Sequence, residues 1–382
     1  MKNDRLSTSR LGKLKKRMAR FPRQPLIHLP TPLQKMSRLT ALLGGPDIWM
    51  KREDLTGLAF GGNKSRKMEY ILADILAQKA DTVITWASLQ SNWCLQMSAA
   101  ARMFGIEPIL VLFKTYDLPE EPDGNLLLDR LLGAEVRIKE AGRGKSVSLE
   151  TGLSHLEAVA DEARKKGRRP YLVPVGGSMP AGSMSQPLGA LAYVQALMEL
   201  AEQMGALGLQ IGSVVHATGS GGTQAGLVVG AKALGLETRI IGISVSEEKT
   251  SFARIVLDIC RRTEEALGLG TVVNPEDVIV LDDYLGQGYG IVDRQVARVV
   301  AEVFRAEGVL LDPVYTAKAM VGLQDLAHKC FFQPGRAVVF FHTGGTPALF
   351  PNRRKLLELM CKASCLPSAD VLQVLEELAV RG

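Results

Sequence analysis

Short runs of apolar, often β-branched residues alternate along most of the chain with segments of helical periodicity. Thr82–Thr85 is typical of a strand, and Ser91–Phe104, which follows it, is typical of a helix. Strands separated by helices indicate βαβ units, in which neighbouring strands are parallel and helices cover the sheet. The further strands that we predict are Pro108–Phe113, Glu135–Lys139, Tyr171–Val175, Ser213–Thr218, Arg239–Val245 and Ala337–His342, and the further helices are Leu126–Leu132, Ser154–Lys166, Leu188–Met204 and Gln224–Leu234.

The chain is long enough for two such sheets. It has 382 residues, and 46% of them are hydrophobic, which allows a sizeable core. We therefore expect an α/β fold of two domains, each an open, mostly parallel twisted sheet flanked by helices. We assign residues 61–170 to the smaller domain and residues 1–60 with 171–382 to the larger one. Lys139–Ser148 predicts a loop, and Arg353–Val380 predicts a helical tail.

Charge and composition narrow the class of partner. Lys and Arg total 46 and Asp and Glu total 40, so the net charge is 46 − 40 = +6. This modest excess fits an enzyme for anionic cofactors and substrates. We expect no nucleic-acid partner, because no dense basic stripe with interleaved aromatic residues occurs. We expect no membrane span, because no run of about 18 or more apolar residues occurs.

The N-terminus and the cysteines bear on location. Residues 1–21 are basic and weakly amphipathic, without the apolar stretch of a secretory signal. A solvated helix with Leu11, Leu14 and Met18 underneath is favoured over an organelle transit segment. Five scattered cysteines predict reduced thiols and a cytoplasmic location. Cys361 and Cys365 could share a helix face, but no further ligand nearby completes a metal site.

One lysine lies where a helix is predicted to begin. Gly61 and Gly62 allow a close turn, and Lys64 follows at the helix entrance. The positive end of the helix dipole and burial both disfavour its ammonium form, and a lysine of lowered pKa suits Schiff-base chemistry. A surface lysine in a basic turn is the ordinary alternative. The predicted buried face of this helix consists of Met68, Ile71, Leu72, Ile75 and Leu76.

A glycine-rich loop follows the predicted strand that ends at Thr218. Its backbone N–H groups could converge on an anion at a helix N-terminus, with two hydroxyl groups beside them. The loop lacks the spacing of a nucleoside-triphosphate loop or of a dinucleotide fold, so a single phosphate suits it better and an NAD-dependent enzyme is disfavoured. A plain strand–helix turn is the alternative. The loop consists of Gly219, Ser220, Gly221, Gly222 and Thr223.

Four other polar loops follow predicted strands or lie near helix starts. Residues 88–92 contain Gln90, Ser91 and Asn92, where Ser91 or Asn92 could be an ordinary helix cap or could bind a substrate carboxylate and a cofactor. The other three are residues 286–290, 311–316 and 342–347. Ligands of open α/β sheets bind at the carboxyl ends of strands, so these loops and Lys64 together indicate one site.

At these motifs the sequence resembles PLP (pyridoxal 5′-phosphate) enzymes of the tryptophan-synthase-β type, in the branch of D-cysteine desulfhydrase, L-cysteate sulfo-lyase and 1-aminocyclopropane-1-carboxylate (ACC) deaminase. The resemblance runs from about residue 21 to about residue 351. It implies that PLP lies in the cleft between the two domains and that the protein is a homodimer. The motifs that carry it are PTPL at 30–33, KREDLTGLAFGGNKSRKMEY at 51–70, QSN at 90–92, TGSGGTQAG at 218–226, GYG at 288–290, EGVLLDPVYTAKAM at 307–320 and HTGGTPALF at 342–350.

The resemblance also implies a role for each matching residue. Lys64 would bind PLP covalently, Asn92 would bond its phenolic oxygen and Gly219 to Thr223 would hold its phosphate. Thr316 and Thr346 lie where a partner of the pyridine nitrogen is expected. The residues implied at the substrate are Gln90, Ser91, Trp93, Tyr289 and Tyr315, with Lys64, Ser91, Tyr289 and Tyr315 in catalytic roles.

Two departures bear on the substrate. Deaminases of this branch are expected to carry Glu after the tyrosine of the DPVY motif, where this chain has Thr316, as in the desulfhydrase-like members. A hydroxyl stabilises a protonated pyridine less than a carboxylate does, which favours β-elimination over opening of a cyclopropane ring. The desulfhydrase-like members are also expected to have His-Val-Arg-Gln after QSN, where this chain has Trp93-Cys94-Leu95-Gln96.

We therefore expect a lyase that removes a β-substituent from a small amino acid and releases pyruvate and ammonia, as a D-cysteine desulfhydrase does. L-Cysteate sulfo-lyase is the first alternative and an ACC-deaminase type of enzyme the second. A PLP-binding protein without lyase activity is the alternative from another class, motivated by the altered Trp93–Leu95 segment.

Overall fold

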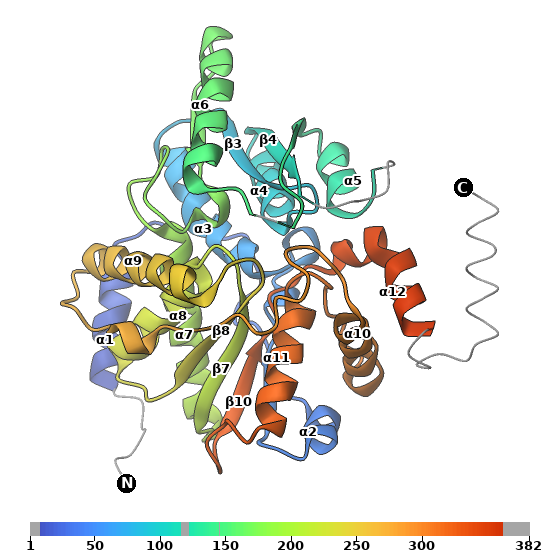
Figure 1. Cartoon of the computed structure of the whole chain (residues 1–382). Coiled ribbons are helices and arrows are strands. Elements are labelled where there is room, and N and C mark those ends of the chain that lie inside the picture. The colour runs from blue at the N-terminus through green and yellow to red at the C-terminus, as the bar shows by residue number, and fades with distance from the viewer. Residues whose placement is uncertain (1–7, 116–121, 145, 362–382) are drawn as a thin grey trace.

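The computed structural model describes residues 8–115, 122–144 and 146–361 of the chain (Figure 1). Helices and strands alternate through most of this part, as the sequence predicts. The helices are α1 (Thr8–Met18), α2 (Ser37–Leu43), α3 (Asn63–Ala77), α4 (Asn92–Met103), α5 (Gly124–Leu131), α6 (Leu149–Lys165), α7 (Leu188–Leu207), α8 (Gly222–Leu234), α9 (Lys249–Leu267), α10 (Arg294–Glu307), α11 (Thr316–His328) and α12 (Arg353–Cys361). The strands are β1 (Leu33–Lys35), β2 (Ile48–Lys51), β3 (Thr82–Ser88), β4 (Glu107–Lys114), β5 (Glu135–Glu140), β6 (Pro170–Val173), β7 (Ile211–Thr218), β8 (Arg239–Ser244), β9 (Ile279–Leu281) and β10 (Ala337–Phe341).

The larger sheet has six strands in the order β1-β2-β10-β7-β8-β9. Only the edge strand β1 runs antiparallel to its neighbour, and the other pairs are parallel. Every residue of β7 is buried, because this central strand is covered on both faces. The predicted α/β fold with mostly parallel sheets and flanking helices is confirmed.

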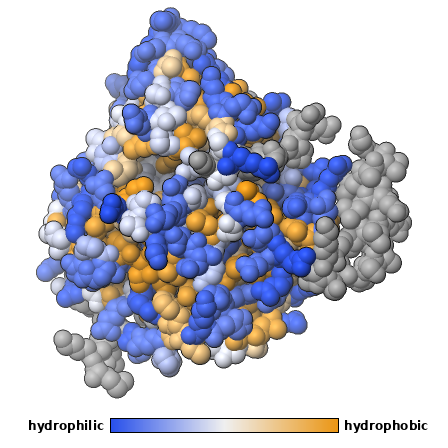
Figure 2. All heavy atoms as spheres, viewed as in Figure 1, coloured by the Kyte–Doolittle hydropathy of each residue, from blue (hydrophilic) through white to orange (hydrophobic). Residues whose placement is uncertain are grey.

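The smaller sheet has four parallel strands in the order β5-β4-β3-β6 and lies above the larger one in Figure 1. Helix α6 packs its apolar face against β3 and β6. Its outer face is hydrophilic and forms the upper end of the molecule in Figure 2. Because β6 pairs with β3, this sheet continues past residue 170, where we placed the end of the smaller domain. The division into domains stays a prediction.

Helix α7 joins the layers of the core. It is buried along most of its length, and it packs against both α3 and α8. Its alanines and leucines are good helix formers, and burial of each leucine contributes about 1.5–3 kcal/mol. The two helices whose first turns face the candidate site, α3 and α8, are thereby held on one support.

Most predicted elements match the observed ones to within a few residues. The helix expected over Ser91–Phe104 is observed over Asn92–Met103, and α1 buries Leu11, Leu14 and Met18 as predicted. Leu76 is an exception, because it lies near the end of α3 and is 37% exposed. Of the predicted tail, α12 covers the first part, while residues 362–380, with Cys365, lie outside the described residues. None of the described helices is long and apolar enough to cross a membrane.

Candidate active site

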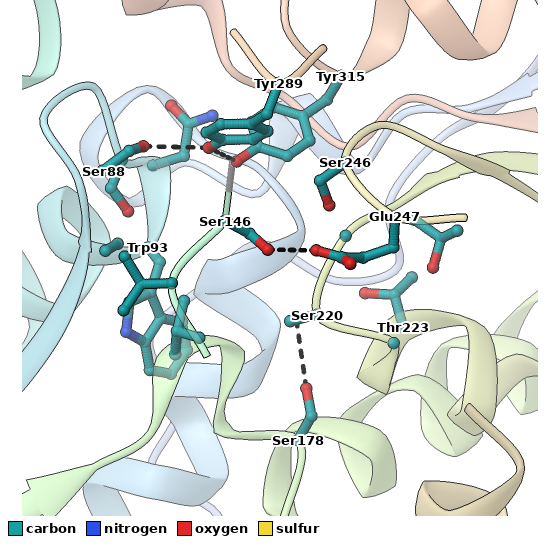
Figure 3. Close-up of a pocket in the computed structure, with 18 of the residues that line it drawn as sticks. Ser88, Trp93, Ser146, Ser178, Ser220, Thr223, Ser246, Glu247, Tyr289 and Tyr315 are labelled. Atoms are coloured by element: carbon teal, nitrogen blue, oxygen red, sulfur yellow. Dashed lines mark hydrogen bonds between the residues drawn. The ribbon is translucent and has the colours of Figure 1, made fainter. Parts of the chain in front are cut away.

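A cavity of about 510 Å³ lies at the carboxyl ends of the central strands of both sheets. Residues from both sheets line it, including the ends of β3 and β7 and the first turns of α3 and α4 (Figure 3). Predicted site residues that line this cavity are Lys64, Ser91, Asn92, Trp93, Gly219, Ser220, Gly221, Thr223, Tyr289 and Tyr315. The structure therefore brings together most of the residues that the sequence singled out.

Lys64 is the second residue of α3 and faces the cavity from a tight turn. The turn needs glycine, because Gly61 and Gly62 have φ angles of 70° and 126°. A Cβ atom on Gly61 would lie 1.9 Å from the carbonyl oxygen of Asp54. Asn63 fixes the other side of the turn, since its N–H donates to the carbonyl of Thr343 at 3.0 Å.

A buried ionic network supports this turn from beneath. The Arg66 guanidinium donates to both carboxylate oxygens of Glu53, at 2.6 and 2.8 Å, and to Glu199 of α7 at 3.1 Å. Lys51 also pairs with Glu199. Two carboxylates thus meet two cations, which offsets the large cost of removing these charges from water. Lys51, Glu53 and Arg66 lie within 16 positions of one motif, but Glu199 lies 133 positions after Arg66 and meets them only through the fold. The local signal of pairing in the sequence was therefore limited to three of the four residues.

Burial lowers the pKa of Lys64 to about 8, and the carboxylate of Asp312 opposes this shift. A lowered pKa was expected from the helix entrance and from burial, and burial is the dominant cause. The Lys64 amine donates to Oδ1 of Asn63 at 2.9 Å, and Nδ2 of Asn63 donates to the Thr223 hydroxyl at 3.1 Å. Lys64 therefore lies within a side chain's reach of the glycine-rich loop.

The glycine-rich loop connects β7 to α8 and forms a cradle of N–H groups. Gly221 has a φ of 78°, and the first turn of α8 begins at Gly222 with N–H groups that have no intrahelical acceptor. A Cβ atom on Gly222 would lie 2.3 Å from the Ser178 hydroxyl, so Gly222 forms the closely packed base of the cradle and does not line the cavity. Ser178 and Ser220 contact each other at 3.3 Å, and both line the cavity. Such a cradle fits one phosphate group.

Two residues beside this cradle were missed in the sequence. Ser178 follows a glycine pair, and Lys67 lies one helical turn after Lys64. Lys67 is fully buried, and its amine donates to the carbonyl of Gly176 at 3.3 Å. Gly176 in turn packs against Ser220. Burial keeps the pKa of Lys67 well below its usual range, and the charge of Lys64 lowers it further.

The loop after β3 holds Ser91 and Asn92. Ser91 is the N-cap of α4 and accepts the N–H of Cys94 at 3.2 Å, so the ordinary capping role is present. Oδ1 of Asn92 accepts from the Asn125 amide at 2.8 Å, which leaves its amino group to donate. Gln90 does not line the cavity. Its amide instead holds the start of α5, donating to the Asp123 carbonyl and accepting from the Asn125 N–H, both at 2.8 Å.

Two tyrosines stand together at one side of the cavity, next to Ser88 (Figure 3). The rings of Tyr289 and Tyr315 meet edge to face at 5.9 Å between centroids, and their hydroxyl groups are hydrogen-bonded. The Tyr289 hydroxyl also contacts the Ser88 hydroxyl at 3.0 Å. Burial raises the pKa of Tyr289, so its hydroxyl holds its proton at neutral pH. The Lys64 amine lies 6.0 Å from the centre of the Tyr315 ring.

The two threonines expected near a pyridine nitrogen do not line the cavity. Thr316 is fully buried at the start of α11, where its hydroxyl donates to the Asp312 carboxylate at 2.7 Å. Thr346 begins a short 3₁₀ helix, Thr346–Asn352, in a different loop, the one that follows β10. Thr343, three residues earlier, lines the cavity instead. The loop after β10 thus reaches the cavity with Thr343, and the cofactor roles of Thr316 and Thr346 stay predictions.

Trp93 lines the cavity with an indole ring that is fixed in place. Its Nε1 donates to the Thr85 hydroxyl of β3 at 2.8 Å, and the residue is only 2% exposed. The two residues after it, Cys94 and Leu95, are buried in the packing of α4. Burial holds the pKa of the Cys94 thiol well above its usual range, so this cysteine stays a thiol at neutral pH.

The arrangement fits PLP. A buried amine of lowered pKa, a single-phosphate cradle and a donor amide lie in one cavity, and the base of the cradle has no room for a Cβ atom. These are the groups that a Schiff base, a phosphate and a phenolic oxygen require. Across the described residues no cluster of metal-ligating side chains occurs.

Comparison with known proteins agrees with this geometry. Residues 25–344 match the family described as pyridoxal-phosphate dependent enzyme. The chain is 39% identical over 340 residues to the D-cysteine desulfhydrase of Serratia proteamaculans, which covers 88% of this chain and 98% of that protein. It is 38% identical over 338 residues to the ACC deaminase of Methylobacterium nodulans, covering 87% and 97%.

A solved structure supports the same assignment. An ACC deaminase homologue is 38% identical in sequence and superposes with a TM-score of 0.81, over 91% of this chain and 99% of that one. The similarity thus extends over both sheets and over every loop of the cavity described above. This chain belongs to the family of pyridoxal-phosphate dependent enzymes.

Proposed function

We propose that this PLP-dependent enzyme is a carbon–sulfur lyase, which removes a β-substituent from a small amino acid and releases pyruvate and ammonia, as a D-cysteine desulfhydrase does. The observation that carries the proposal is the position of Lys64. Its amine, with a pKa lowered to about 8, faces the same cavity as the phosphate cradle, Asn92 and the tyrosine pair. A base and an acid therefore face one cavity of about 510 Å³.

The residues that would hold the cofactor follow from their geometry. Lys64 would bind it covalently, the loop from Gly219 to Thr223 with Ser178 would hold its phosphate, and the Asn92 amide would donate to its phenolic oxygen. Lys67 would support the cradle from beneath. When bound, PLP supplies an electron sink that stabilises negative charge at the α-carbon of the amino acid.

The protein side chains would then move the protons. Once the amino group of the substrate has replaced it on the cofactor, the freed Lys64 amine would take the α-proton, because about a tenth of it is unprotonated one pH unit below its pKa. Ser91, at the N-terminus of α4, binds the substrate carboxylate with the free N–H groups of that helix. Tyr289 keeps its proton at neutral pH and is placed to donate it to the departing group.

Elimination is favoured over cyclopropane opening by the residue after Tyr315. Thr316 has no charge, and its hydroxyl donates to Asp312, so the position at which the resemblance implies Glu in deaminases supplies no carboxylate to the cofactor. The weaker electron sink that results suits a good leaving group such as sulfide. The second candidate is an ACC deaminase, because relatives with that name are as similar in sequence as the desulfhydrases.

The test is a substrate panel on the purified holoenzyme. Pyruvate release from D- and L-cysteine, L-cysteate and β-chloroalanine, and 2-oxobutanoate release from ACC, would be followed in coupled assays. We expect pyruvate from cysteine or β-chloroalanine and none with Lys64→Ala. Turnover of ACC alone would replace the proposal by the second candidate. No turnover of any compound would favour a PLP-binding protein without lyase activity.

We also propose that the enzyme is a cytoplasmic homodimer, as the family resemblance implies. Light scattering on the purified protein gives its mass in solution, which we expect to be twice that of one 41.4 kDa chain. A monomer mass would refute this part of the proposal without bearing on the chemistry.

A further inference from the structure

One acidic side chain stands in the cavity without a part in the proposed reaction. Among the described residues, Lys64 and Glu247 are the carboxylate- or amine-bearing side chains that line it. Figure 3 shows Glu247 reaching from the large-sheet side toward Ser146, which comes from the segment between β5 and α6. The Ser146 hydroxyl donates to the Glu247 carboxylate. The two sides of the cavity therefore meet at this carboxylate.

The position of Glu247 is fixed by its own backbone. It lies just after β8, and the hydroxyl of Ser244, the last residue of that strand, donates to the Glu247 carbonyl at 2.6 Å. The same hydroxyl accepts the Glu247 N–H at 3.1 Å. Ser244 is fully buried, so this double contact holds the turn. The carboxylate is thus positioned by the strand end and by Ser146.

No described cation shares the cavity with Glu247 except Lys64, which lies at the cofactor position. Ser146, Ser246 and Thr223 lie near Glu247 in Figure 3, and the apolar residues Val147 and Ile255 also line the cavity. The Glu247 carboxylate would repel a negatively charged substrate side chain, because no described cation beside it offsets the repulsion. It would not repel a neutral or a positively charged side chain.

We propose that Glu247 is a specificity-determining residue that rejects amino acids with an anionic β-substituent, such as a sulfonate or carboxylate. This inference rests on the proposed function and deepens it. The expected substrates are then small amino acids whose β-substituent is uncharged before it leaves, such as a thiol. L-Cysteate, with its sulfonate, is excluded. Like charges that share one partly solvated cavity repel each other, and we expect roughly tenfold discrimination from this repulsion.

The experiment compares two ligands of equal shape and different charge. Binding of asparagine and of aspartate, in both enantiomers, to the holoenzyme is measured by calorimetry for the wild type and for Glu247→Gln. Glutamine keeps the acceptor for Ser146 and removes only the charge. Glu248→Gln is the matched control, because Glu248 is the exposed neighbour at the start of α9 and does not line the cavity.

We expect the wild type and Glu248→Gln to prefer asparagine by about tenfold or more, and Glu247→Gln to lose most of that preference. Three results would each overturn the proposal. They are an equal preference in wild type and Glu247→Gln, a wild-type preference for aspartate, and no measurable binding of asparagine. A second arm measures kcat/KM for cysteine and cysteate, where Glu247→Gln should raise the cysteate-to-cysteine ratio about tenfold. Absence of turnover in both proteins would count against the proposed function, while the binding ratio would still decide the role of Glu247.

Discussion

The hydroxyl of Ser65 donates a 2.8 Å hydrogen bond to Oε1 of Gln96, which joins helix α4 to the turn that presents Lys64. The other end of the same amide, Nε2, donates to the carbonyl of Gly61. Both partners lie within three residues of Lys64, and Gln96 is only 2% exposed. One buried side chain therefore ties helix α4 to the turn that presents Lys64.

Replacing this amide should loosen the lysine turn. Gln96→Met keeps the size of the side chain but leaves the Gly61 carbonyl without its donor, which costs about 1–3 kcal/mol for a buried group. We expect that loss in the free energy of unfolding from urea titrations, together with weaker PLP binding measured by dialysis. An unchanged PLP dissociation constant would show that Gln96 stabilises the fold without positioning Lys64.

The elements and the place of the site were predictable from the sequence because they depend on local patterns. Glycines before a helix mark the Lys64 turn and the phosphate cradle, since each needs backbone conformations that side chains rarely adopt. Alternating strands and helices define the α/β class. Each of these features is determined by a few neighbouring residues.

Side-chain direction was less predictable because it depends on tertiary contacts. Thr316 was expected at the cofactor ring, yet Asp312, four residues earlier, accepts its hydroxyl and turns it away from the cavity. Gln90 was expected at the substrate, but its amide holds α5. Glu247 has no motif of its own, and it reaches the cavity only because β8 ends there.

The pKa of Lys64 gives a prediction for the apoenzyme. Only the unprotonated amine attacks PLP, and burial lowers the pKa of Lys64 to about 8. The rate of PLP attachment should therefore rise about tenfold per pH unit below pH 8 and level off above it. Stopped-flow absorbance after mixing apoenzyme with PLP measures this rate. A rate that keeps rising to pH 10 would mean that the amine is not desolvated.

Lys318 should position the loop that carries Tyr289. Its amine donates to the carbonyls of Leu285 and Gly288, both at 2.7 Å, and the residue is 1% exposed. Lys318→Met removes both bonds, so we expect a loss of about 1–3 kcal/mol in stability and a fall in kcat that exceeds any change in KM. Lys329→Met, at the exposed end of the same helix, is the control and should change neither. Equal effects of the two variants would contradict the positioning role.

His216 should make the folded protein sensitive to acid. It is fully buried on β7, its Nδ1 lies 2.9 Å from the carbonyl oxygen of Ala217, and its Nε2 contacts no described hydrogen-bonding partner. Burial, together with the charges of Lys67 and Lys64, lowers the pKa of His216 to about 4 from an ordinary value of 6.5, although the hydrogen bond with the Ala217 carbonyl opposes this shift. Below pH 6.5 His216 therefore binds a proton in the unfolded chain but not in the folded protein.

The sign of this linkage fixes the pH window of the prediction. The contribution of His216 is fully present above pH 6.5 and is lost as the pH falls toward 4, by at most about 3.5 kcal/mol, since one pKa unit corresponds to about 1.4 kcal/mol. His216→Gln cannot take up this proton. The difference in unfolding free energy between wild type and His216→Gln, measured by urea titration of the apoenzymes, should therefore shift in favour of the variant between pH 6.5 and 4.5. A difference that is constant over this range would show that the imidazole already carries its proton in the folded protein.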